Sequence, residues 1–235
     1  MMKYMFMSVA GLLLATQFAL AQQPSAEALI AVLKTDAPRL EKVNAAHALG
    51  VIGQKEAVAP LAALLDNPEL AQAARYALEM IPDPSADEAL RRAVTRLNGS
   101  LLVGVLNSIG NRRDAQAVTD VAPQLRSNDP AVAAAAAATL GRIATPAAAE
   151  ALKPLIAQAR AAAEAYLRCA ERMPDRYAEL VAAGDRVPAP VRLAALRGVM
   201  LNDASGARLI AGLKSGSACE VAVADRKGTR LNSSH

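Results

Sequence analysis

The sequence predicts an all-α fold in which short helix pairs repeat along the chain. Three observations support this prediction: an apolar composition that is nearly free of aromatic residues, an apolar phrase that recurs along the chain, and prolines at matching places between the phrases. Hydrophobic residues make up 53% of the 235 residues and aromatic residues only 3%, so the apolar content is mostly Ala, Leu and Val, which favours helices. A mean hydropathy of +0.19 excludes a disordered polyelectrolyte.

Residues 1–21 have the pattern of a secretory signal peptide. Lys3 supplies one positive charge, an apolar stretch follows from Tyr4 to Phe18, and Ala19-Leu20-Ala21 provides the small residues before a cleavage site. The alternative is a membrane anchor, but the uninterrupted apolar run ends at Thr16-Gln17, short of the ~20 residues that span a bilayer. We therefore expect cleavage after Ala21, a periplasmic or secreted protein, and no membrane span after signal removal.

The C-terminal residues 225–235 carry no apolar periodicity. They closely resemble the translated sequence of a short-read sequencing adapter, with Gly228 where that translation usually has Ser. The alternative is a polar disordered tail. We expect residues 217–235 to be a truncated end with a non-native tail, so that the natural protein continues past Ala224.

The signal and the tail distort the apparent charge of the chain. Removing Lys3 with the signal, and Arg226, Lys227, Arg230 and Asp225 with the tail, reduces the 26 basic and 22 acidic residues to 22 and 21. This balance gives no reason to expect nucleic acid or an anionic membrane as a partner.

A phrase of the form Leu-x-x-Ile, followed by a turn, recurs about every thirty residues. Its copies are Leu49 to Gly53, Leu78 to Pro82, Leu106 to Gly110, Leu140 to Ala144 and, more loosely, Ala170 to Pro174 and Leu196 to Val199. A period of this length accommodates two short helices in each repeat.

The segments between these phrases contain proline at corresponding places, as in Pro60, Pro123 and Pro154. A proline inside an apolar helical pattern kinks or restarts the helix because it lacks an N–H. Asn67-Pro68 and Asp129-Pro130 are typical helix starts, since a polar cap precedes a proline in the first turn. Each repeat is therefore predicted to contain a kinked helix, a capped turn and a straighter second helix.

The second helices have more apolar surface than one buried face requires. Between Pro38 and Ile52, Leu40, Val43 and Val51 lie on one side, whereas Ala45, Leu49 and Ile52 lie on another. One helix pair cannot enclose this surface, so we expect neighbouring repeats to cover it by stacking.

These residues resemble the HEAT repeats of the short bacterial type known as PBS-lyase HEAT-like. Ala45 to Gly53 is similar to the family's Ala-Ala-x-Ala-Leu-Gly-x-Ile-Gly phrase, and Val191 to Leu196 to its Val-Arg-x-Ala-Ala opening. The resemblance implies a right-handed α-solenoid of about six HEAT-like helix pairs, which we place within a repeat domain at residues 22–216. It also implies that the second helices line a concave surface.

Chemistry-bearing residues are sparse. His47 has no Asp, Glu or Cys three or four residues away, so we expect a partly buried structural histidine and predict no catalytic residue, metal ligand or cofactor. Cys169 and Cys219 are the two cysteines, and an oxidising compartment would permit a disulfide between them. A free thiol, or a partner beyond the truncated end, is the alternative.

Arginine is the one functional residue type in excess, with nineteen copies against seven lysines. Arg75, Arg142, Arg168 and Arg197 lie on predicted second helices and are candidate ligands for carboxylates, sulfates or phosphates. The alternative is that they are solvated and paired with nearby acidic residues such as Glu79 and Glu171.

We therefore expect an exported, non-catalytic scaffold that binds a protein partner through its concave surface. The alternative is the accessory repeat region of a larger exported enzyme, of a glycoside-processing, c-type haem or lyase type, whose catalytic domain is missing from this fragment. This second interpretation rests on analogy between folds.

Overall fold

A computed structural model describes residues 24–203, and all regular structure in that range is helical. The chain divides into two compact units, residues 1–83 and 84–235, whose described parts are residues 24–83 and 84–203. The predicted signal peptide and the predicted adapter-like tail lie outside the described residues.

Unit 1 contains four α-helices and one short 3₁₀ helix within its described part. They are α2 (Ala26–Lys34), α3 (Arg39–Ile52), η1 (Lys55–Ala57), α4 (Val58–Ala62) and α5 (Ala71–Met80).

The second helices of unit 1, α3 and α5, pack directly against each other, with α2 against α3 and α4 against α5. Gly50 allows this close approach, because a Cβ added there would stand 2.8 Å from the Ala77 Cα. Gly53, at φ +74°, ends α3 in the left-handed conformation that glycine adopts readily. The buried core between these helices includes Leu49, Leu61 and Leu78.

Unit 2 continues the alternation of first and second helices. Its α-helices are α6 (Pro84–Val94), α7 (Gly99–Arg112), α8 (Val118–Val121), α9 (Pro130–Ile143), α10 (Pro146–Leu152), α11 (Arg160–Arg172), α12 (Tyr177–Ala182) and α13 (Ala189–Asn202). Its 3₁₀ helices are η2 (Ala115–Ala117), η3 (Ala122–Arg126), η4 (Lys153–Leu155), η5 (Pro174–Arg176) and η6 (Gly184–Arg186).

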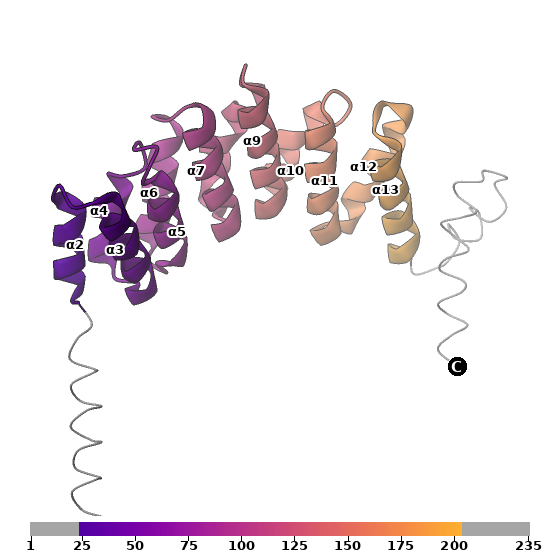
Figure 1. The fold of residues 1–235 in the computed structure, drawn as a ribbon. Coiled ribbons are helices and arrows are strands. Elements are labelled where there is room, and N and C mark those ends of the chain that lie inside the picture. The colour runs from indigo at the N-terminus through magenta and orange to yellow at the C-terminus, as the bar shows by residue number, and fades with distance from the viewer. Residues whose placement is uncertain (1–23, 204–235) are drawn as a thin grey trace, which may run out of the picture. The chain divides into compact units, whose positions relative to one another are not determined.

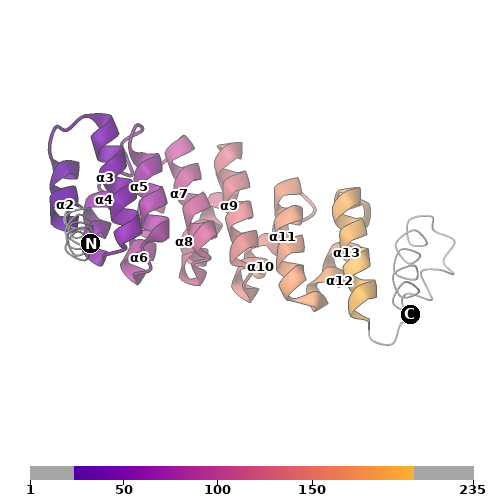
Figure 2. The ribbon, with the colours of Figure 1, turned by 60° about the horizontal axis from the view of Figure 1, so that its bottom comes forward.

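The second helices of unit 2 stack in chain order. In Figures 1 and 2, α7, α9, α11 and α13 stand side by side, and each packs against the next. Gly141 brings α9 close to α11, since a Cβ at this position would stand 2.9 Å from the Ala165 Cα. Neighbour-to-neighbour packing of helix pairs is the arrangement of a HEAT-like solenoid, as the sequence predicts.

The predicted turn chemistry is confirmed at one helix start and differs at another. Asp129 caps α9 by accepting a hydrogen bond from the Ala131 N–H at 2.8 Å, and Pro130 occupies the first turn. Asn67, in contrast, accepts from the Glu69 N–H within a turn, and α5 begins only at Ala71. The Asn67-Pro68 pair therefore caps a turn that leads into the helix.

The prolines of the first helices act as predicted in two repeats. Pro123 lies in η3 directly after α8, and Pro154 lies in η4 directly after α10. The missing N–H changes an α-helix into a tighter 3₁₀ helix at these places. Pro60, however, lies within α4.

One expectation about the second helices is wrong. In α3, Leu49 is fully buried, but Leu40 and Val51 on the other apolar side are 69% and 74% exposed. The second apolar side of this helix is thus left in contact with solvent instead of being covered by a neighbouring helix. Across residues 24–203, the structure contains no helix with the length and apolarity needed to span a membrane.

Candidate functional site

An exposed group of apolar and aromatic side chains lies on the second helices of unit 1. We define the apolar patch as His47 and Val51 of α3 together with Tyr76 and Met80 of α5. Within each helix the two residues are one turn apart and share a face. The two helices pack together, and the His47 and Tyr76 ring centroids are 5.4 Å apart with the planes tilted by 58°.

The apolar patch is open to solvent, because Val51, Tyr76 and Met80 are 74%, 53% and 41% exposed. His47 is also exposed, so the expectation of a partly buried structural histidine is wrong. Val51, one turn after His47, lies on the uncovered side of α3. The face of α3 that carries His47 is therefore exposed to solvent and is not part of the core.

Of the predicted arginines, Arg75 and Arg142 are half-buried. Arg75 on α5 is half-buried, and its Nε has no hydrogen-bond partner among the described residues. Burial lowers the pKa of its guanidinium, although the negative charge of Glu79 acts to raise it. Arg142 on α9 donates to the side-chain oxygens of Asn107 at 2.7 Å and Asn111 at 3.2 Å, which joins α9 to α7.

Arg168 on α11 and Arg197 on α13 are instead exposed. Neither forms a hydrogen bond or ion pair with another described residue. Arg172, which the sequence analysis did not select, is also exposed and lies one turn after Arg168. Within unit 2 the predicted row thus combines one arginine that ties two helices together with two that face solvent.

Cys169 is fully buried between α9 and α11, and its Sγ donates a weak hydrogen bond to the Leu140 carbonyl at 3.9 Å. Burial raises the pKa of this thiol to about 11, although the charges of Arg176 and Arg172 act in the opposite direction. Cys219 lies outside the described residues, so the predicted disulfide stays a prediction.

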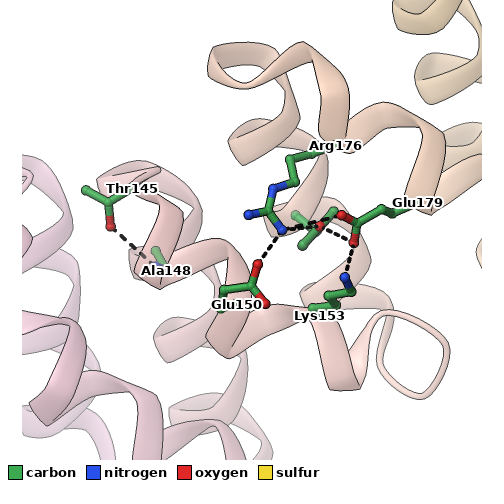
Figure 3. Close-up of polar contacts among 7 residues, drawn as sticks. Thr145, Ala148, Glu150, Lys153, Arg176 and Glu179 are labelled. Carbon is green, nitrogen blue, oxygen red and sulfur yellow. Dashed lines mark hydrogen bonds and ion pairs between the residues drawn. The ribbon is translucent and has the colours of Figure 1, made fainter.

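A polar network that no sequence pattern indicated lies on the first-helix side of unit 2 (Figure 3). The Arg176 guanidinium donates to Glu150 at 2.5 Å and to Glu179 at 3.4 Å. Glu179 accepts a second hydrogen bond, at 2.7 Å, from the Tyr166 hydroxyl, and Lys153 forms an ion pair with it at 2.9 Å. The network connects α10, η4, α11, η5 and α12.

The ionisation of this network follows from its contacts. Burial, assisted by the hydrogen bond to Glu179, raises the pKa of Tyr166 to about 12. Burial also acts to raise the pKa of Glu179, but hydrogen bonds from Lys153 and Tyr166 and the nearby positive charges outweigh it and lower that pKa. The hydrogen bond to Glu150 raises the pKa of Arg176. The network is a charge-balanced connection between successive repeats.

Within residues 24–203 there is no group of three or more His, Cys, Asp or Glu side chains that could hold a metal ion. We place the candidate site on the exposed sides of the second helices, where the apolar patch and the exposed arginines lie.

Among the comparisons with known proteins, one family model matches a single repeat of the chain. The family model described as PBS lyase HEAT-like repeat matches residues 42–67, a span that runs from within α3 to the turn after α4. A solved structure similar to the chain is the complex of CpcE and CpcF of phycocyanin lyase from Nostoc sp. PCC7120, with 25% sequence identity, a TM-score of 0.40, and coverage of 85% of this chain and 80% of that chain. A search of curated proteins finds no match. Residues 42–67 thus match the model of one PBS lyase HEAT-like repeat, and helices continue to pair along each unit.

Proposed function

We propose that this HEAT-repeat scaffold is exported and acts by binding a protein partner, without catalysis of its own, through the exposed sides of its second helices. The apolar patch of His47, Val51, Tyr76 and Met80 is the observation that carries the proposal. Soluble proteins seldom leave adjacent large apolar side chains in water unless another surface covers them.

The composition of the apolar patch suits a protein interface. Tyr76 offers a large, rigid ring with a polar hydroxyl, and such residues are enriched among those that contribute most to binding. Met80 adds a flexible side chain that adapts to a partner's shape. Both residues project from a helix that is packed against its neighbour, so binding requires little ordering of the backbone.

A capture experiment tests this proposal. The wild-type protein serves as bait for the exported proteins of its source cells, beside a patch variant with Val51→Gln, Tyr76→Gln and Met80→Gln. The matched control carries Lys55→Gln, Glu56→Gln and Glu69→Gln, all at exposed positions in unit 1.

We expect the wild type and the control to capture the same protein, and the patch variant to bind it at least about tenfold more weakly, because central interface residues contribute over about 1 kcal/mol each. Circular dichroism should be unchanged, since all three patch residues are exposed. Equal capture by the patch variant would overturn the proposal.

Export is tested separately. The small-residue pattern Ala19-Leu20-Ala21 supports cleavage before Gln22. N-terminal sequencing of the protein recovered from the periplasmic or secreted fraction should begin at Gln22. Recovery only from the cytoplasm, with the leader retained, would contradict export without affecting the binding proposal.

A further inference from the structure

Among the described residues of unit 2, six arginines form ion pairs with carboxylates of the same unit. The ion pairs are Arg91 with Asp114, Arg92 with Glu88, Arg112 with Asp87, Arg160 with Glu164, Arg176 with Glu150 and Arg192 with Asp185. Arg92 and Arg160 pair within their own helices, and the other four arginines pair with a carboxylate of another element. An external ligand would have to displace an internal carboxylate to reach any of the six.

Arg168, Arg172 and Arg197 differ from this set. All three are exposed, and none forms a hydrogen bond or ion pair with another residue in the range 24–203. Arg168 and Arg172 are one turn apart on α11, and Arg197 lies on α13, which packs against α11. Their guanidinium donors are available to a ligand without the loss of an internal contact.

Acidic residues on these two helices do not balance the three charges. On α11, Glu164 is paired with Arg160 at 2.7 Å. Glu171 is exposed, and its charge adds to the effect of burial in raising the pKa of Tyr177. Helix α13 contains no acidic residue between Ala189 and Asn202. The exposed sides of α11 and α13 therefore carry a local excess of positive charge.

An exposed apolar side chain adjoins this charge. Leu201 is 51% exposed and lies one turn after Arg197 on α13. We define the α11–α13 surface as Arg168, Arg172, Arg197 and Leu201. It offers guanidinium groups for carboxylates and one apolar contact.

We propose that the α11–α13 surface binds an acidic protein segment, with side-chain carboxylates on the three arginines and an apolar side chain against Leu201. Guanidinium groups match carboxylates in two-point hydrogen bonds. The apolar contact favours a protein segment over an inorganic anion or a nucleic-acid backbone. This site goes beyond the proposed function, because it lies in unit 2 and shares no residue with the apolar patch.

Fluorescence anisotropy tests the proposal with a labelled synthetic peptide in which glutamates surround a leucine. The test variant carries Arg168→Gln, Arg172→Gln and Arg197→Gln. The matched control carries Arg92→Gln, Arg96→Gln and Arg126→Gln, which change the net charge of unit 2 by the same amount away from the surface. Both sets are tested in the full chain at low ionic strength.

The test variant should lose about 10- to 100-fold in affinity, as expected for three exposed ion pairs, and the control should stay within about threefold of the wild type. Leu201→Ser should weaken binding of this peptide but leave unchanged the binding of a peptide in which serine replaces the leucine. Equal losses in test and control variants would show that only net charge attracts the peptide, and would overturn the proposal.

Two further outcomes separate this site from other ligands and from the proposed function. Duplex DNA or inorganic phosphate that binds the surface more tightly than the peptide would overturn the assignment to an acidic protein segment. The patch variant with Val51→Gln, Tyr76→Gln and Met80→Gln should bind the peptide as the wild type does. Loss of peptide binding in that variant would contradict a separate site in unit 2.

Discussion

The Thr139 hydroxyl of α9 donates a 2.7 Å hydrogen bond to the Leu106 carbonyl of α7. Both residues are fully buried, so a side chain of one repeat is bonded to the backbone of the preceding second helix. Cys169 of α11 repeats this relationship with Leu140 of α9, where a weaker thiol donor takes the place of the hydroxyl. A buried side-chain donor thus links α9 to α7, and another links α11 to α9.

Replacing Thr139 with Val should destabilise the protein by about 1 kcal/mol. Valine has the same shape as threonine but lacks the hydroxyl donor, so the buried Leu106 carbonyl loses one hydrogen bond. Urea unfolding measures the change. The control is Thr119→Val, whose hydroxyl is exposed and makes only a local contact with Gln116, and it should stay within about 0.5 kcal/mol. A Thr139→Val protein as stable as the wild type would show that the hydrogen bond contributes nothing.

The Gly141→Ala substitution should destabilise the contact between α9 and α11. The new Cβ would stand 2.9 Å from the Ala165 Cα and 3.0 Å from its carbonyl oxygen, and backbone atoms cannot move aside as a side chain does. We expect a net loss of about 1–3 kcal/mol from overpacking, even though Ala favours a helix over Gly by about 1 kcal/mol.

Thermal unfolding checks this loss, with the double variant Gly141→Ala/Ala165→Gly as the comparison. Removing the Ala165 methyl should recover only part of the stability, because the Cα and the carbonyl oxygen remain in place. An unfolding midpoint raised by Gly141→Ala alone would mean that the contact between α9 and α11 has room for a methyl group.

The sequence predicted the repeat architecture because helix periodicity, proline positions and polar caps act over a few neighbouring residues. Asp129 and Pro130 illustrate this, since the cap and the first turn are specified within three residues. The burial of His47 was predicted wrongly for a different reason. The spacing of Val43, His47 and Val51 shows that they share a face, but it does not show whether another helix covers that face.

The polar network was missed because its members come from different helices. Tyr166, Arg176 and Glu179 are separated by 10 and 3 residues, and Glu150 lies 26 residues before Arg176. Charged residues at such separations occur throughout the chain. Only the turn at η5, which places Arg176 between two carboxylates, brings these groups together, and no local pattern in the sequence specifies that position.

Glu179→Gln should destabilise the protein at neutral pH by about 1.5–3 kcal/mol, the magnitude of hydrogen bonds to a charged group. The folded state lowers the pKa of Glu179, so the contribution of its carboxylate is present above the unfolded pKa of about 4.3 and is lost as the pH falls through the folded value. The stability difference between the wild type and Glu179→Gln should therefore shrink below about pH 4.

Denaturant unfolding of both proteins between neutral and acidic pH measures this difference. Glu88→Gln is the control, because Glu88 is exposed and paired only with the exposed Arg92 on the surface of α6. Its effect should be small at every pH. A Glu179→Gln difference that does not change with pH would contradict a lowered pKa in the folded state.

Cys169 should be unreactive in the folded protein. Its side chain is fully buried, and its pKa of about 11 leaves little thiolate at neutral or mildly alkaline pH. In a Cys219→Ser protein, which isolates this thiol, we expect modification by a disulfide reagent to proceed only as fast as the protein unfolds. Adding urea should accelerate the reaction steeply, whereas Arg168→Gln, an exposed change on the same helix, should leave the rate unchanged. Rapid modification of the folded Cys219→Ser protein would show that α9 and α11 separate readily, and would place this interface among the least stable parts of unit 2.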